Sequence, residues 1–175
     1  VFYVVLAGVV SQRLFGLSTR QDESGDINLT ARQRSFGTGM LPLVGLMFSF
    51  AAFDWLMSLD PLWFSTIYGV YYFAGSFLSA ISLLVIITDR ARGKNLYGDL
   101  VSDEHIHNLG KLMLAFTAFW GYIGFSQFRL IWIAGLPEEV PFYIVRLLGG
   151  WAAIRGVLTR GHFVTPFSAL LALSL

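Results

Sequence analysis

Residues 62–94 read LWFSTIYGVYYFAGSFLSAISLLVIITDRARGK, and this stretch decides the fold. Its first part, 62–88, carries no charged residue and consists largely of aliphatic and aromatic side chains. A helix of about 20 mostly apolar residues crosses a hydrocarbon core of roughly 30 Å, whereas a soluble core helix has no reason to be so long and so apolar on every face. Arg90, Arg92 and Lys94 follow directly. We therefore expect a transmembrane helix over 62–88 that ends at a basic connection.

The same pattern recurs along the chain, of which 55% is apolar. The other apolar stretches cover roughly 1–10, 37–58, 109–134 and 142–158, and one more begins near 163. Together they predict an all-α fold, a polytopic transmembrane helical bundle with about six membrane segments. We expect 1–175 to form a single transmembrane domain. Because the chain begins inside one apolar run and stops inside another, we also expect it to be a fragment of a longer chain.

The connections between these stretches alternate between basic and non-basic, which predicts their orientation. Connections 59–61 and 135–141 contain no Lys or Arg. The basic connections carry Arg13, Arg20, Arg32 and Arg34, then Arg90, Arg92 and Lys94, and finally Arg155 and Arg160. By the positive-inside rule the basic connections are cytoplasmic. The opposite boundary then receives the amphipathic rings that favour a membrane interface, namely Trp55, Trp63, Tyr68, Trp132, Phe142 and Tyr143.

Composition excludes several classes of function. A net charge of +1 argues against nucleic acid as a partner. The chain has no Cys, which excludes thiolate-ligated iron–sulfur clusters, disulfides and cysteine zinc sites within it. A haem held by two imidazoles needs histidines that face each other, but we expect His105 and His107 at a helix entrance and His162 in a turn. Any redox metal is therefore expected in a partner subunit.

Local signals predict how the helices begin and where they touch. Asp and Pro before an apolar run can cap a helix and supply its first dihedral, and carboxylates in a first turn meet the positive end of the helix dipole. The expected starts are Asp60-Pro61, joining the second and third helices in a tight antiparallel hairpin, Ser102-Asp103-Glu104 and Pro137-Glu138-Glu139. Small residues at helical spacing predict helix contacts in two stripes, Gly75, Ser79 and Ser82, and Gly149, Ala153 and Gly156.

Polar groups at membrane depth are the candidates for function, because a charge near the bilayer centre costs at least ~2.5 to 3.5 kcal/mol on insertion scales. Asp54, Gln127, Arg129 and Arg146 are all expected in one outer layer. By spacing, Arg129 shares a helical face with Tyr122 and Ser126, whereas Gln127 points away from it. Two interpretations stay open here. Either the arginines snorkel outward and Asp54 pairs with one of them, or Asp54, Gln127 and Arg146 line a hydrated path or a quinol head-group pocket.

The chain also resembles a known family over about residues 50–170. The resemblance rests on Phe53-Asp54-Trp55-Leu56-Met57-Ser58 followed by Asp60-Pro61-Leu62-Trp63-Phe64-Ser65-Thr66, then His107, Leu109-Gly110-Lys111, Phe119-Trp120, Phe125-Ser126-Gln127, Ile131-Trp132, Pro137-Glu138-Glu139, Arg146, Gly150-Trp151, His162-Phe163 and Pro166-Phe167. In this order and with these gaps, the segments are similar to the ActF subunits of bacterial alternative complex III, which are NrfD-like membrane proteins. Arg129 and Gly135 depart from that pattern, where an apolar residue and Asn are expected.

The resemblance implies a subunit of a respiratory quinol:electron-acceptor oxidoreductase in the bacterial inner membrane. It implies no cofactor in this chain, haem c and iron–sulfur clusters in partner subunits, and quinol as the substrate of the complex. An NrfD-like sister subunit is then the expected quinol site. The chain itself would scaffold the assembly, and a proton path through it is the further role that the resemblance suggests.

Three functions are therefore weighed. The first is a non-catalytic subunit in which Asp54, Gln127 and Arg146 on the outer side, and His107 and His162 near the inner side, are candidate proton-relay groups. The second is a subunit that oxidises quinol itself, with Asp54 as proton acceptor and Trp63 and Tyr68 beside the ring. A secondary transporter would need an unwound midplane helix and an inverted repeat, and neither is seen in the sequence.

Overall fold

The computed structural model describes residues 1–96 and 100–174, which form helices joined by turns and contain no strand. The predicted all-α fold is therefore confirmed. The chain divides into two compact units, Val1–Leu59 and Asp60–Leu175. Each unit is a set of packed helices.

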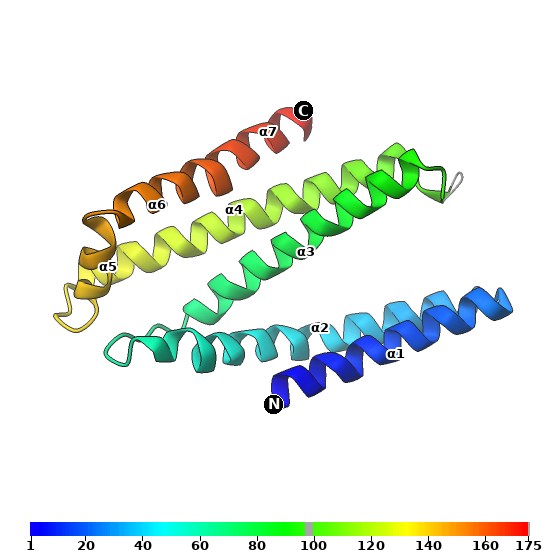
Figure 1. Cartoon of the computed structure of the whole chain (residues 1–175), viewed down its shortest axis with the longest axis horizontal. Helices are drawn as coiled ribbons and strands as arrows, with labels where there is room; N and C mark the ends of the chain where they lie inside the picture. Colours follow the sequence, from blue (N-terminus) through cyan, green and yellow to red (C-terminus); the bar gives the residue numbers. More distant parts are fainter. Residues whose placement is uncertain (97–99, 175) are drawn as a thin grey trace. The chain divides into compact units, whose positions relative to one another are not determined.

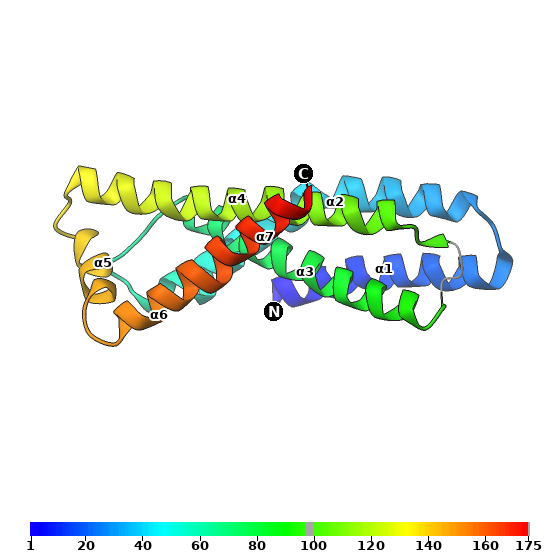
Figure 2. The ribbon, with the colours of Figure 1, turned by 90° about the horizontal axis from the view of Figure 1, so that it is seen from above.

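The first unit is a helical hairpin. Helices α1 (Phe2–Ser24) and α2 (Asn28–Trp55) run side by side (Figures 1 and 2), and the short 3₁₀ helix η1 (Met57–Leu59) follows them. Gly25 has a left-handed φ of 66° and its N–H donates to the Gln21 carbonyl over 2.8 Å, which ends α1. Polar side chains hold the closed end, where Gln21 Nε2 donates to Thr30 Oγ1 over 2.7 Å and Gln33 Nε2 donates to Gln21 Oε1 over 2.9 Å.

This hairpin corrects two predictions. The first apolar stretch does not end near residue 10, because α1 continues to Ser24. The expected long basic connection is also wrong, since only residues 25–27 join the two helices, and the four arginines lie within α1 and α2. The sequence signal was misread because polar residues such as Gln and Arg are good helix formers beyond the apolar part of a span.

The second unit contains α3 (Tyr68–Gly93), α4 (Asp103–Ala134), α5 (Val140–Leu147), α6 (Trp151–Val157), the π-helix η3 (Leu158–Val164) and α7 (Thr165–Ser174). Helix α4 packs along α3, and α7 lies against the other side of α4 (Figures 1 and 2). Helices α6, η3 and α7 follow one another without a connection. Residues 71–79 of α3 and 114–120 of α4 are continuously helical.

A sharp bend replaces the predicted fifth segment, 142–158. Helix α5 and the run that begins at Trp151 make an angle of 88°. The bend falls at residues 148–150, where Gly149 has a φ of 58°. The expected sixth segment near 163 lies inside the same helical run as α6, so Arg155 and Arg160 belong to a helix and not to a connection. The orientation itself stays a prediction.

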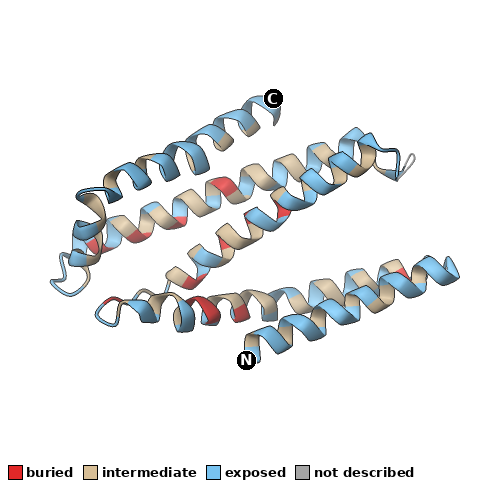
Figure 3. Ribbon diagram, viewed as in Figure 1, coloured by how far each residue is buried: buried red, intermediate tan, exposed pale blue. Residues whose placement is uncertain are grey.

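Among the residues that the structure describes, three helices are long and apolar enough to cross a membrane, namely Phe2–Ser24, Asn28–Leu59 and Tyr68–Gly93. Counting the bent pair Val140–Leu147 and Trp151–Leu173 as one span gives up to four. The prediction of about six spans is not confirmed. Helix α4 has 32 residues but is not among the candidates, and polar side chains such as Gln127 and Arg129 lower its hydropathy. Buried positions are few (Figure 3), so most apolar side chains face outward.

Helix starts follow the predictions in part. Helix α4 begins after Ser102, whose Oγ lies 2.7 Å from His105 Nδ1, as the Ser102-Asp103-Glu104 signal predicts. Helix α5 begins at Val140, so Glu138 and Glu139 precede its first turn and the expected start at Pro137-Glu138-Glu139 is too early. The tight connection at Asp60-Pro61 is wrong, because α3 begins only at Tyr68. Residues 60–63 instead form a turn in which the Trp63 N–H donates to the Asp60 carbonyl over 3.0 Å.

Glycines set the close approaches of α4. Gly75 of α3 meets the Trp120 ring, where an added Cβ would lie 3.2 Å from Nε1, so part of the first predicted stripe is a helix contact. At Gly149 and Gly156 an added Cβ would meet nothing within 4 Å, so these two glycines of the second stripe mark no close helix contact. Two contacts were missed. Gly121 lies under the Phe163 ring, and Gly124 lies under the Tyr71 ring.

Candidate functional site

Asp54 lies in the first unit, and the other four predicted site residues lie on α4, α5 and η3 of the second unit. Asp54 is exposed near the end of α2 and accepts a hydrogen bond from the Tyr3 hydroxyl of α1. His107 is exposed near the start of α4. Gln127 lies further along α4, His162 in η3 and Arg146 in α5. The pairing of Asp54 with an arginine therefore stays a prediction, because the described partner of Asp54 is a tyrosine of its own unit.

Helix α4 presents two polar lines, as the spacing predicts. Gln127 is 5% exposed and shares the buried face with Ile123 and Ile131. Arg129 is exposed, as is Tyr122, with 66% of its surface accessible. Thus Gln127 faces the helices that pack on α4, and Arg129 faces outward.

His162 occupies an unexpected position. It was predicted in a turn, but it lies in the π-helix η3. Its ring meets Trp120 edge to face, with centroids 4.8 Å apart. A π-helix inside a helical run widens the backbone and is frequently found at functional sites. The imidazole is exposed, so this position gives it one aromatic neighbour and free access from outside.

A pocket of about 480 Å³ lies where the 60–63 turn, the 137–142 segment and the start of α6 meet. We call it the charged pocket, because three of its side chains are ionisable. It is lined by Asp60, Leu62, Trp63, Pro137, Glu138, Pro141, Phe142, Val145, Arg146 and Trp151. Of the predicted site residues, Arg146 alone lines it.

Arg146 is held in this pocket by a stack of three groups. The Trp63 and Phe142 rings are parallel, with centroids 3.8 Å apart and planes inclined by 8°. Arg146 Cζ lies 3.4 Å from the centroid of the same Phe142 ring. Both distances are those of van der Waals contact, so Trp63 and Arg146 must occupy opposite faces of Phe142. Arg146 Nη1 also donates to the Phe142 carbonyl over 2.7 Å, which fixes the guanidinium and leaves its other N–H groups available.

Arg146 forms no ion pair with a carboxylate of the described residues. Within residues 1–96 and 100–174 the one ion pair joins Arg92 to Asp103 at the α3–α4 end, with the nitrogen 2.5 Å from the oxygen. Arg146 is half-buried, and Asp60 and Glu138 line the same pocket without forming an ion pair with it. The pocket therefore offers a fixed cation and two separate anions.

Trp63 is the most deeply buried residue of the pocket, with 3% of its surface exposed. Its indole Nε1 is the one fully buried side-chain nitrogen or oxygen without a hydrogen-bond partner in the described part of the chain. The ring also meets Tyr68 edge to face, with centroids 5.3 Å apart. A buried donor without a partner is uncommon, because a hydrogen bond that is lost to water and not replaced in the protein costs about 1 to 3 kcal/mol.

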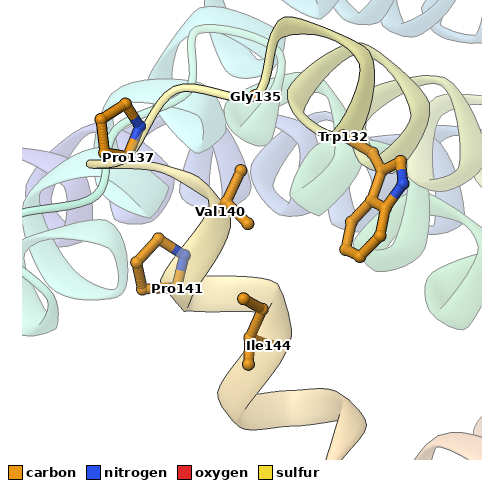
Figure 4. A pocket seen from close by; sticks show the side chains of 6 residues that line it. All are labelled: Trp132, Gly135, Pro137, Val140, Pro141 and Ile144. Carbon is orange, nitrogen blue, oxygen red and sulfur yellow. The ribbon is translucent and has the colours of Figure 1, made fainter.

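A second pocket of about 400 Å³ adjoins the first. We call it the apolar pocket, since Trp132 faces Val140 and Ile144 across it (Figure 4) and none of its lining residues is ionisable. Gly135, Pro137 and Pro141 complete the lining, and both prolines also line the charged pocket. One apolar and one charged compartment thus share a wall at the end of α4.

The pockets were not predicted from the sequence, although several of the residues that line them were singled out there. The outer boundary was expected to hold Trp63, Trp132 and Phe142, but no pattern in the sequence indicated that Phe142 would lie between Trp63 and Arg146.

The part of the chain that the structure describes contains no group of three His, Cys, Asp or Glu side chains able to hold a metal ion. No family model matches the chain, and no curated protein matches it.

Proposed function

We propose that this chain is a cofactor-free membrane subunit of a bacterial respiratory quinol:electron-acceptor oxidoreductase of the alternative complex III type. In this role it scaffolds the redox subunits in the inner membrane and provides a proton path. The observation that carries the proposal is the composition of the charged pocket. Most of its lining comes from segments on which the resemblance rests, namely 60–63, 137–138, Arg146 and Trp151.

Convergence of these segments supports the resemblance because they are far apart in the sequence. Residues 60–63 and 137–151 both match the family pattern, although they are not neighbours in the sequence. A common structural feature would explain why both segments match. Here they build the Trp63, Phe142 and Arg146 stack and the pocket around it.

Exposure of apolar side chains supports a scaffolding role. No residue within the most apolar part of α1 is buried in the chain's own fold, and only 17% of the corresponding part of α3 is buried. Leu83, Leu84 and Ile87 of α3, for example, are each at least 50% exposed. Such faces need lipid or the helices of other subunits as cover.

Purification of the native complex tests the proposal. The tagged chain is extracted from its own membranes in mild detergent, and the eluate is examined for haem c by optical spectra, for iron–sulfur clusters by electron paramagnetic resonance, and for quinol oxidation. We expect all three to copurify with partner subunits. Recovery of the chain without redox subunits, or with a haem bound to the chain itself, would contradict the proposal.

Quinol oxidation by this chain is the alternative, and the contact of Trp63 with Tyr68 beside the charged pocket favours it over other functions. The Asp54→Asn variant of the intact complex separates the two. Lost turnover in an assembled complex supports quinol chemistry at Asp54. Unchanged turnover with reduced proton release supports a proton path. If neither turnover nor proton release changes, the role of Asp54 is structural, through its hydrogen bond with Tyr3.

A further inference from the structure

We propose that the charged and apolar pockets together bind one zwitterionic phospholipid, with its phosphate at Arg146 and its ammonium group at Asp60 and Glu138. The inference needs the chain to lie in a membrane, but it does not depend on the respiratory role. Its starting point is the pairing of two compartments of opposite character that share Pro137 and Pro141. Such a pair matches an amphipathic ligand, whose polar and apolar parts need adjoining but different surroundings.

The phosphate position follows from Arg146. Its guanidinium is fixed by the Phe142 ring and carbonyl, it has no carboxylate partner within the described ranges, and it lines the pocket with unused N–H donors. A planar guanidinium with free donors is suited to bidentate contact with phosphate oxygens. Since the side chain is already ordered, little further freedom is lost when it binds.

The ammonium position follows from the opposite charges of the same pocket. Asp60 and Glu138 would repel a free dianionic phosphate, but they complement an ethanolamine ammonium. Trp151, 51% exposed, adds an aromatic face of the kind that attracts ammonium groups. One cation and two anions around a single pocket thus favour a dipolar head group over a purely anionic one.

The membrane position is consistent with a lipid. Helix α5 lies at 88° to the run that follows it, so if that run crosses the bilayer, α5 lies along the boundary. Its Ile144 and Val145 are 42% and 59% exposed, as suits a helix whose apolar side meets acyl chains. A pocket of about 480 Å³ is within the range of small-ligand sites.

Lipid binding by the full chain, purified with whatever subunits accompany it and then delipidated, tests the inference by native mass spectrometry. The probes are dioleoyl phosphatidylethanolamine, dioleoyl phosphatidylglycerol, glycerophosphoethanolamine and inorganic phosphate. We expect the intact ethanolamine lipid to bind about tenfold or more tightly than each of the others. The Arg146→Gln variant should lose about tenfold or more of that affinity, as for loss of a charge-assisted hydrogen bond.

The matched control is Arg129→Gln, which makes the same change at an exposed arginine outside both pockets. It should bind the ethanolamine lipid as the unchanged protein does. Equal affinities for the two arginine variants would overturn the phosphate site. Glu138→Gln should reduce the preference for the ethanolamine lipid over the glycerol lipid, and this variant tests the proposal if Arg146→Gln does not fold. Equal affinity of the unchanged protein for the two lipids overturns the ammonium site. If glycerophosphoethanolamine, which has no acyl chains, binds as tightly as the intact ethanolamine lipid, the role of the apolar pocket is overturned.

Discussion

Gly121 and Gly124 allow two aromatic rings to pack directly against a helix backbone, because a glycine has no side chain. Each lies in α4, where the Phe163 and Tyr71 rings respectively rest against the backbone. A β-carbon at Gly124 would come within 3.0 Å of the Tyr71 ring, and one at Gly121 would overlap Phe163 more severely. These two positions therefore fix how closely α3 and η3 approach α4, and this is why Trp120 can contact both Gly75 and His162.

Gly121→Ala should destabilise the protein by about 1 to 3 kcal/mol, since the Phe163 ring must move out of its position. Unfolding in mixed detergent micelles, followed by tryptophan fluorescence, measures the change. Gly110→Ala is the control on the same helix. Nothing lies within 4 Å of an added Cβ there, so alanine should stabilise the helix by about 0.5 to 1 kcal/mol. Equal effects of the two substitutions would show that Gly121 does not set the contact.

The bend between α5 and α6 is the element that most changes the site. It turns what the sequence suggests as one span into a short helix and a longer one at 88°. As a result Phe142 and Arg146 lie beside the 60–63 turn, where Trp63 meets them. Without the bend, α5 would continue along the axis of α6 and the stacking of Trp63 on Phe142 would be lost, whereas the contact of Arg146 with Phe142 lies within α5 and does not need the bend.

Gly149→Ala should weaken this bend, because an L-residue in the left-handed region costs about 1 to 2 kcal/mol. Gly149 has a φ of 58°, whereas its neighbour Gly150 has a φ of −63°. Gly150→Ala should therefore be neutral or stabilise by about 0.4 to 1 kcal/mol through the unfolded state. The free energy of unfolding in detergent distinguishes the two variants. A loss of stability at Gly150 as large as that at Gly149 would rule out backbone strain as the cause.

The absence of Cys from the chain makes its membrane topology directly measurable. Single cysteines at Ile27, Leu96 and Leu136 fall in or beside connections, and the natural side chains there are 79%, 70% and 49% exposed. If the basic connections are cytoplasmic, a membrane-impermeant maleimide should label Leu136→Cys in spheroplasts, whose inner membrane is intact. Ile27→Cys and Leu96→Cys should react only after permeabilisation. The reverse pattern, or labelling of all three from outside, would contradict the orientation.

Membrane attachment of the whole chain gives a second measurement. With at least three helices able to span a bilayer and with largely exposed apolar faces, the chain should stay in the membrane fraction after alkaline carbonate and high-salt washes. Detergent should release it, and a peripheral protein expressed in the same cells provides the control. Release by carbonate alone would mean that these helices pack on protein rather than in lipid.

Local sequence patterns were sufficient to predict the helical class, the long apolar helices and the start of α4. These depend on local physics, because an uncharged run of bilayer length or a Ser before acidic residues carries its meaning within a few turns. The alternation of Gln127 and Arg129 between a buried and an exposed face is likewise a matter of helical spacing. Alternative complex III remains a proposal drawn from the resemblance.

The packed structure was needed to show that Phe142 lies between Trp63 and Arg146, that α5 turns away from α6, and that His162 lies in a π-helix against Trp120. Each of these joins residues distant in the sequence or depends on a backbone angle at one glycine. Helical periodicity reports which face a residue occupies but not which neighbour meets it. The pockets are built from such meetings, so their contents became visible only when the helices were packed.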